Sequence, residues 1–173
     1  MANGLHELLA RGAQPQDWVL VHDAARCLVT TAQIDALIDA CQGDSVGGLL
    51  AHKLADTLKT ASDGPGGVRV AATVDRSDKW LAQTPQVFRR DWLLAAYEQR
   101  GKLGNAITDD AQLMEAAGHS VHLVDGASTN IKITTKQDVY LAEAILKSLP
   151  KPKVSGSPHP FGDEEMWGGR GLK

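Results

Sequence analysis

The sequence predicts an α/β fold built on a parallel sheet, and three observations support this class. Helical and strand patterns alternate along the chain. The run Val19-Leu20-Val21 is apolar without interruption, which is typical of a strand covered on both faces. Residues 18–51 contain a strand pattern, a helix pattern and a second strand pattern, the unit that forms a right-handed crossover. With 173 residues, the chain is long enough for one core and short for two.

The elements of the first 51 residues follow from apolar spacing and from capping residues. Apolar side chains three or four residues apart predict two helices, and Gly12 and Gly43 stand where these helices would end. Thr30 is the expected N-cap of the second helix. In order, we expect a helix at 5–12, a strand at 18–22, a helix at 31–43 and a strand at 46–51.

The pattern breaks between residues 55 and 74, where there is no helical periodicity. Two short extended runs, 56–60 and 68–74, flank Asp63-Gly64-Pro65-Gly66-Gly67, a sequence typical of a turn. We therefore expect a β-hairpin arm at about residues 55–76. A two-stranded ribbon is marginal in water, so we expect the arm to pack on a second subunit.

The remaining residues predict three further helices, whereas the run 80–88, which contains Thr84-Pro85-Gln86, carries no predicted helix or strand. Thr135 and Asp138 form a start like a capping box for the last helix. The proline and glycine content beyond Pro150 predicts a disordered tail at 150–173, which leaves a domain at 1–149. The expected elements are helices at 89–100, 109–118 and 139–149, a strand at 120–124 and an extended piece at 130–134.

Composition and charge exclude several classes of protein. The formal net charge of -3 gives no sign of a nucleic-acid groove or a basic membrane face. Cys27 and Cys41 form neither a C-x-x-C pair nor a disulfide framework, which fits a reducing compartment. There is no signal-peptide pattern at the start and no apolar run long enough to cross a bilayer. We expect a cytoplasmic protein, or one of the plastid stroma if the source is a plant.

Polar side chains follow the expected strands at the ends where α/β enzymes bind ligands. Asp23 could hold a divalent cation or a sugar hydroxyl, and Arg26 could grip a phosphate with two parallel hydrogen bonds. The competing interpretation is that Asp23 caps the turn and pairs with Arg26 on the surface. A phosphorylated substrate needs several cations and hydroxyls that converge on it. Strand ends and loops offer such a set: Arg26, Thr57, Lys59, Arg76, Thr84, Thr108, Asp109 and Lys132.

Six motifs follow one another along the chain: Val19 to Arg26 (VLVHDAAR), Asp56 to Lys59 (DTLK), Thr73 to Arg76 (TVDR), Thr84 to Gln86 (TPQ), Thr108 to Asp110 (TDD) and Asn130 to Thr134 (NIKIT). Together they resemble the motif series of the 2-C-methyl-D-erythritol 4-phosphate cytidylyltransferase family, over roughly residues 2–149. Six motifs in order are far more specific than any one of them. The resemblance implies a three-layer, Rossmann-like nucleotidyltransferase fold of the glycosyltransferase-A type, with a β-hairpin dimerisation arm.

The resemblance also implies a reaction. The family transfers CMP from CTP to 2-C-methyl-D-erythritol 4-phosphate and releases pyrophosphate, in non-mevalonate synthesis of isoprenoid precursors. It uses a divalent cation, usually Mg²⁺. The expected partners are therefore these two small-molecule substrates and a second copy of the chain, with no nucleic acid and no membrane.

The resemblance assigns roles to residues of this chain. Arg76 and Lys132 match the catalytic pair that would hold the substrate phosphate for attack on the α-phosphorus of CTP. Asp23 would contact the substrate or the metal ion. The arm would swap across a homodimer, so that Arg76 would reach the neighbour's site. The substrate pocket would be lined by Asp23, Arg26, Thr57, Thr84, Thr108 and Asp109.

One family feature has no match in this sequence. The family begins with a strand and a basic, glycine-rich loop that cradles the CTP phosphates. The glycine clusters here, at 47–48, 64–67 and in the tail, form no basic strand-to-helix turn, and the N-terminal residues resemble the middle of the family's sequence. We therefore expect an N-terminally truncated chain with a partial sheet and an exposed edge at Val19. Such a polypeptide would fold poorly and alone neither bind CTP nor turn over.

Two other classes of function stay open. A nucleotidyltransferase of the same architecture could act on a sugar phosphate, although the arm and the 130–134 motif argue against it. A non-catalytic remnant could have kept only substrate binding and dimerisation.

His22 could be taken for a general base, but a phosphate nucleophile is already ionised at neutral pH, so we expect His22 to pack or to hydrogen-bond the loop. His119 and His122 would face opposite sides of a strand, which argues against a shared metal ion.

Overall fold

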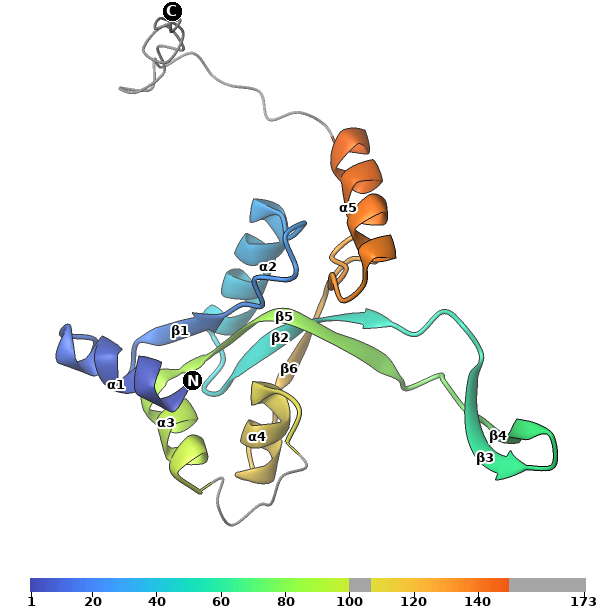
Figure 1. Ribbon diagram of the computed structural model, residues 1–173. Coiled ribbons are helices and arrows are strands. Elements are labelled where there is room, and N and C mark those ends of the chain that lie inside the picture. Colours follow the sequence, from blue (N-terminus) through green and yellow to red (C-terminus); the bar gives the residue numbers. More distant parts are fainter. Residues whose placement is uncertain (100–106, 150–173) are drawn as a thin grey trace, which may run out of the picture.

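The computed structural model describes residues 1–99 and 107–149 of the chain (Figure 1). The expected helix end at Arg100 and the expected disordered tail at 150–173 lie outside these residues. In chain order the elements are α1 (Ala2–Ala10), β1 (Trp18–Val21), α2 (Thr31–Gln42), β2 (Gly47–Lys53), β3 (Leu58–Gly64), β4 (Gly67–Val74), β5 (Trp80–Arg89), α3 (Arg90–Gln99), α4 (Asp110–Ala116), β6 (His122–Asp125) and α5 (Lys136–Ser148).

Four of the strands form one mixed sheet, in the order β1-β5-β2-β6. β2 and β6 are parallel, but β5 runs antiparallel to both β1 and β2. The expectation of a parallel sheet is therefore wrong for β5. The physical reason is the connection: the chain leaves β2 at Lys53, passes through the arm and returns at Trp80, directly opposite Lys53. A hairpin-like return of this kind makes an antiparallel pair, whereas a parallel pair needs a crossover.

The central strand β5 is the element that the sequence pattern did not predict. Its middle residues are buried although two of them are glutamines, Gln83 and Gln86, and one is Pro85. The Thr84–Pro85 peptide bond is cis. Proline and buried amides hide the apolar run by which an interior strand is normally found.

The sheet is covered by helices on both faces, so the expected three layers are confirmed (Figure 1). Leu49 and Phe88 point into a core that includes side chains of α1, α3 and α4. Their sequence neighbours Leu50 and Val87 point the other way, against α2. This is the two-residue alternation of a strand, repeated in register on neighbouring strands.

The outer strand β1 is less covered than predicted. It pairs only with β5 among the described strands, and Leu20 keeps 40% of its surface exposed. Burial on both faces is therefore wrong for Leu20, whereas the expected exposed edge at Val19 is confirmed for the described sheet. The reason is that a side chain on an edge strand has neighbours on one side only.

The helix boundaries agree with the capping residues. The Thr30 hydroxyl accepts a hydrogen bond from the backbone N–H of Gln33, and the Gln33 side chain accepts one from the N–H of Thr30. Thr135 and Asp138 form the same reciprocal pair at the start of α5, which begins three residues before the predicted helix. Both predicted N-caps are confirmed.

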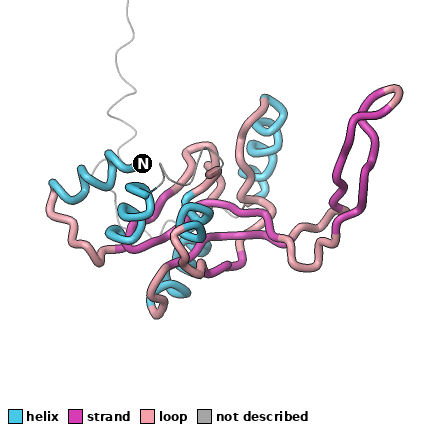
Figure 2. Tube along the Cα trace, turned by 90° about the horizontal axis from the view of Figure 1, so that it is seen from below, coloured by secondary structure: helices cyan, strands magenta, loops and turns pink. Residues whose placement is uncertain are grey.

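The predicted arm is confirmed as a two-stranded hairpin, β3 and β4, which projects from the body of the molecule (Figures 1 and 2). Its strands are exposed almost throughout, and Val68 and Val70 keep 71% and 65% of their surface. Among the described elements, these two strands make extensive contacts only with each other.

The glycine clusters have structural roles away from any helix start. Gly47 begins β2 with φ +120°, and a Cβ added there would overlap the carbonyl oxygen of Val87. Gly64 to Gly67 form the tip of the arm. Neither cluster is a basic strand-to-helix turn, as the sequence indicated.

Candidate functional site

A polar pocket of about 510 Å³ opens where β1 ends, beside the middle of β5 and the start of α4. The cis peptide at Thr84–Pro85 and the turn after Val21 both contribute to its wall. Six of the eight predicted site residues line it: Asp23, Arg26, Thr84, Thr108, Asp109 and Lys132. The fold of one chain therefore brings Thr84, the start of α4 and Lys132 together with the turn at 23–26.

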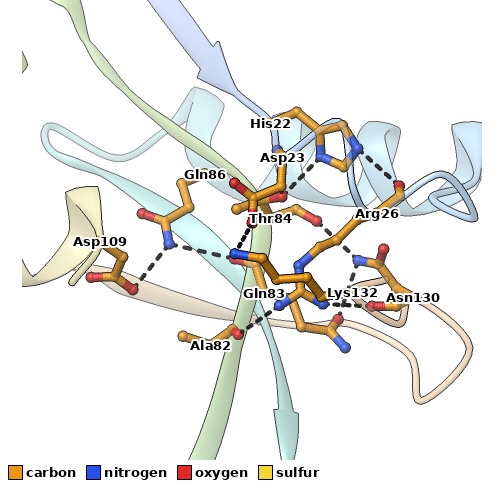
Figure 3. A network of polar contacts seen from close by, with 10 residues as sticks. All are labelled: His22, Asp23, Arg26, Ala82, Gln83, Thr84, Gln86, Asp109, Asn130 and Lys132. Carbon is orange, nitrogen blue, oxygen red and sulfur yellow. Dashed lines mark hydrogen bonds and ion pairs between the residues drawn. The ribbon is translucent and has the colours of Figure 1, made fainter. Parts of the chain in front are cut away.

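An ion pair lies at the mouth of this pocket, between Lys132 Nζ and Asp23 Oδ2 at 2.9 Å. The competing interpretation, in which Asp23 pairs with Arg26, is wrong because Lys132 takes that place (Figure 3). Both side chains are partly exposed, at 49% for Lys132 and 39% for Asp23. Such pairs contribute at most about 1 kcal/mol, so Lys132 can exchange the carboxylate for an incoming phosphate at little cost.

Arg26 is held more firmly than a surface arginine. Its Nη1 donates to the carbonyl oxygen of Asn130 at 2.7 Å, and its Nη2 donates to that of Ala82 at 3.4 Å. Its Nε is buried and has no hydrogen-bond partner within the described part of the chain. Burial lowers the pKa of Arg26, and the nearby Asp23 carboxylate opposes that shift. The guanidinium is thus a fixed positive charge on the pocket wall, and each Nη keeps a second N–H for a ligand.

Asn130 ties this arginine to β5 and was absent from the predicted site. It is fully buried, and its Nδ2 donates to the carbonyl oxygen of Thr84 at 2.9 Å. Gln83 lies beside it and donates to Ala127 O at 2.8 Å. Two predicted motifs contain or adjoin these residues, TPQ and NIKIT, but only their burial identifies them as a framework rather than ligands.

His22 bonds the loop, as expected. Its Nε2 lies 3.1 Å from the carbonyl oxygen of Arg26, and its Nδ1 lies 3.0 Å from the hydroxyl oxygen of Thr84 (Figure 3). The same hydroxyl accepts the backbone N–H of Asp23 at 2.9 Å. His119 lies outside this network and stacks on Trp92 at a ring-centroid distance of 4.6 Å.

The opposite wall is built around the start of α4. Asp109 is the N-cap, and its Oδ1 accepts the backbone N–H of Gln112 at 2.8 Å. Gln86 donates from Nε2 to Asp109 Oδ2 at 3.2 Å and accepts the N–H of Ala111 at 2.8 Å. Burial raises the pKa of Asp110, which accepts a hydrogen bond from the hydroxyl of Tyr97. Gln86 therefore fixes this wall, a role that the sequence alone did not reveal.

Two predicted residues lie elsewhere in this chain. Thr57 is exposed at the base of the arm, and Arg76 donates from Nη1 to Leu54 O at 3.3 Å. Arg76 lines a separate hollow of about 380 Å³ with Lys53, Leu54, Asp75 and Ser77. Lys59, on the arm itself, donates to Thr73 Oγ1 at 2.6 Å. One chain thus gathers Lys132 but not Arg76 in the pocket.

The oxygen donors of the pocket suit a cation that is bound partly by a ligand better than a cation that is bound by protein side chains alone. Within residues 1–99 and 107–149, no three His, Cys, Asp or Glu side chains gather as a metal site would require. Asp23 offers one carboxylate at the pocket. Mg²⁺ is commonly bound by one or two carboxylates together with substrate phosphates, so Asp23 fits that arrangement.

No helix in the described part of the chain has the length and apolar character needed to span a membrane.

Comparison with known proteins adds a family match. The profile of the family described as "2-C-methyl-D-erythritol 4-phosphate cytidylyltransferase" (IspD) matches residues 2–148. The "Bifunctional enzyme IspD/IspF" of Albidiferax ferrireducens is 57% identical over 144 residues, which are 83% of this chain and 33% of that protein. The 2-C-methyl-D-erythritol 4-phosphate cytidylyltransferase of Paraburkholderia xenovorans is 46% identical over 153 residues, 88% of this chain and 63% of that protein.

Solved structures agree with this match. The crystal structure of a 4-diphosphocytidyl-2C-methyl-D-erythritol synthase superposes with a TM-score of 0.74 at 40% identity, over 84% of this chain and 63% of that chain. The Francisella tularensis 2-C-methyl-D-erythritol 4-phosphate cytidylyltransferase superposes with a TM-score of 0.72 at 34% identity, over 83% and 64%. The chain therefore spans less than two thirds of the length of these relatives.

Proposed function

Because the chain belongs to the 2-C-methyl-D-erythritol 4-phosphate cytidylyltransferase family, we propose that its pocket is the polyol-phosphate half of a site for CMP transfer. The reaction takes CMP from CTP to 2-C-methyl-D-erythritol 4-phosphate and releases pyrophosphate, in the non-mevalonate route to isoprenoid precursors. The observation that carries this proposal is the partly exposed Lys132–Asp23 ion pair beside the Arg26 guanidinium, which is held by the Asn130 carbonyl oxygen.

The reaction requires that the two substrates be held in position and that their negative charge be stabilised. A phosphate oxygen of the polyol phosphate forms a bond to the α-phosphorus of CTP, and the bond from that phosphorus to pyrophosphate breaks. The attacking phosphate is ionised at neutral pH, so no side chain has to remove a proton. Lys132 would leave Asp23 for the phosphate, Arg26 would add a second positive charge, and Asp23 would accept hydrogen bonds from polyol hydroxyls.

Arg76 and Thr57 would complete the site from a second copy of the chain. This proposal is supported by an arm whose strands, among the described elements, make extensive contacts only with each other and expose Val68 and Val70, with Arg76 and Thr57 at its base. We expect Val68→Asp with Val70→Asp to shift sedimentation from dimer to monomer. Sedimentation of the unsubstituted chain as a monomer at all concentrations would contradict the homodimer.

A divalent cation, Mg²⁺ by our proposal, would neutralise the CTP phosphates, and binding of this cation is the alternative role of the Asp23 carboxylate. The expected cytoplasmic location is supported by two cysteines, Cys27 and Cys41, that form no disulfide.

Calorimetric titration with 2-C-methyl-D-erythritol 4-phosphate tests the pocket. We expect the affinity to fall about tenfold or more in Lys132→Ala and Asp23→Asn, because each loses a charge-assisted hydrogen bond. Lys147→Ala is the matched control, since Lys147 is an exposed lysine on α5, away from the pocket. Equal affinity for unphosphorylated methylerythritol would contradict the proposal, and tighter binding of a sugar phosphate would favour a related nucleotidyltransferase.

Phosphorus NMR of the same samples with CTP and Mg²⁺ follows the transfer itself. Within residues 1–99 and 107–149, no basic glycine-rich loop joins a strand to the start of a helix, so we propose that this polypeptide alone binds the polyol phosphate without transferring CMP. Turnover near that of a longer family member would overturn this. The role of the cation is tested on a longer family member, where a chelator should stop the transfer of CMP; unchanged transfer would contradict that role.

A further inference from the structure

We propose that His22 is a positioning residue of the pocket: its ring, which donates from Nε2 and accepts at Nδ1, holds the Thr84 hydroxyl and the turn at 23–26 and thereby orients Asp23 and Arg26. The substrate named in the test rests on the proposed function. The protonation of the ring and its effect on the turn do not.

The partner of Nε2 decides where the ring carries its proton. Nε2 lies 3.1 Å from the carbonyl oxygen of Arg26, and a carbonyl oxygen can only accept a hydrogen bond. Nε2 must therefore donate. A neutral imidazole has one N–H, so Nδ1 is left as an acceptor.

The partner of Nδ1 is compatible with this tautomer. Thr84 Oγ1 already accepts the backbone N–H of Asp23 at 2.9 Å, and its own hydrogen is free to donate to Nδ1 at 3.0 Å. The hydrogen bonds therefore run in one direction, from the Asp23 N–H to the Thr84 hydroxyl and on to His22. The last hydrogen bond of this path runs from Nε2–H of His22 to the carbonyl oxygen of Arg26.

This path ties together the two residues that face the ligand. The turn also contains the bond from Arg26 N–H to Asp23 O at 2.9 Å. The backbone of Asp23 is thus held to β5 through Thr84, and the backbone of Arg26 is held through the ring. Their side chains then meet Lys132 and Asn130 from a defined direction (Figure 3).

His22 acts through these neighbours and is not among the residues that line the pocket. Both of its ring nitrogens have partners within the protein, Nε2 in the turn and Nδ1 on β5, which leaves neither for proton transfer to a ligand. The reacting phosphate does not need such a transfer. The role is therefore the orientation of the turn.

Nitrogen-15 NMR of the histidine side chains at pH 8 tests the tautomer directly, without a ligand. We expect His22 to carry its proton on Nε2. In His22→Ala, the Thr84 hydroxyl loses its acceptor, and we expect hydrogen exchange of the Asp23 amide to accelerate about tenfold. The affinity for 2-C-methyl-D-erythritol 4-phosphate should fall by a similar factor.

Two variants separate positioning from general damage. His22→Asn places a carbonyl oxygen near the position of Nδ1, so it should restore slow Asp23 exchange and bring the affinity back to within about threefold of the original. His6→Ala, which removes an exposed histidine on α1, should change neither. A proton on Nδ1, or unchanged exchange and affinity in His22→Ala, would overturn the proposal.

The two proposals fail differently. If the tautomer and the exchange rates are as expected but the polyol phosphate does not bind the original chain, the proposed function fails and the positioning of the turn stands. If the ligand binds and His22→Ala binds it equally well, the proposed function stands and this inference fails.

Discussion

The pocket and the arm of this chain differ in what holds them in place. In the pocket, buried polar groups such as Asn130 and Gln86 bond to backbone groups of distant segments; Figure 3 shows the bond of Asn130 to Thr84. In the arm, β3 and β4 bond to each other, and their side chains face solvent on both sides. The pocket geometry is therefore set within one chain, whereas the arm can acquire a defined place only against something else.

This difference also separates the two residues that the family resemblance pairs. Lys132 belongs to the part of the molecule whose geometry is set internally, and Arg76 belongs to the base of the arm. A site that uses both would be assembled by association rather than by folding alone. The following substitutions compare the two regions.

The largest effect is expected at Phe88, which is fully buried at the centre of the sheet. Phe88→Ala should lower the free energy of unfolding by about 3–5 kcal/mol, because it leaves a cavity beneath α3 and α4. Val70→Ala in the arm should change it by less than about 0.5 kcal/mol at protein concentrations at which the chain is a monomer, since 65% of Val70 is exposed in a single chain. Urea denaturation measures both, and a large effect of Val70→Ala at higher concentrations would mean that the arm is buried against a second subunit.

A glycine substitution in each region comes next. Gly47→Ala should cost about 2–4 kcal/mol, because it combines a positive φ with overlap of the Val87 carbonyl group. Gly67→Ala has the same kind of backbone, φ +116°, but nothing within 4 Å of the added Cβ. It should cost about 1–2 kcal/mol and loosen only the hairpin tip. Thermal unfolding followed by circular dichroism gives the first value, and amide exchange in the arm gives the second.

Two polar contacts give a smaller contrast. Asn130→Ala removes the buried amide that donates a hydrogen bond to the Thr84 carbonyl oxygen. This change should lower the free energy of unfolding by about 1–3 kcal/mol. Lys59→Ala removes an exposed contact across the arm and should cost less than about 0.5 kcal/mol. Chemical denaturation measures the free energy of unfolding of both variants. Equal decreases would mean that burial does not determine how much a hydrogen bond contributes to stability.

The smallest effects concern pH, and their signs are opposite in the two regions. Burial raises the pKa of Asp110, so the folded state holds that proton more tightly than the unfolded state. Its contribution to stability is full below the ordinary value of 3.8 and is lost as pH rises through the raised pKa. Hydrogen bonds from Ser77 lower the pKa of Asp75 at the base of the arm, so its contribution is present above 3.8 and is lost as pH falls.

Unfolding measured between pH 3 and pH 7 checks both signs. In the original chain, Asp110 makes the free energy of unfolding fall as pH rises, and Asp110→Asn should abolish this fall. Asp75 makes the free energy of unfolding fall as pH decreases, and Asp75→Asn should abolish that fall. Slopes of the same sign for both residues would contradict the assignment of burial to one and backbone hydrogen bonds to the other.

The elements that could be predicted are those whose signals are local. Thr30 and Thr135 cap helices through residues three positions away, and the arm follows from a turn sequence between two extended runs. These interactions need only neighbours in the sequence. Six residues that line the pocket could also be named from the sequence, because they belong to the ordered motifs. Arg76 and Thr57 share those motifs, yet the fold of a single chain leaves them apart.

Tertiary structure decided the rest. Periodicity, capping residues and ordered motifs predicted the helices, the hairpin and the family, and the family resemblance implied the three layers, because these signals depend only on the order of residues along the chain. The antiparallel course of β5, the burial of Gln86 and Asn130, and the pairing of Asp23 with Lys132 instead of Arg26 appear only when segments up to about a hundred residues apart meet. Which polar group bonds which partner depends on distance and burial in space, and no local pattern encodes either.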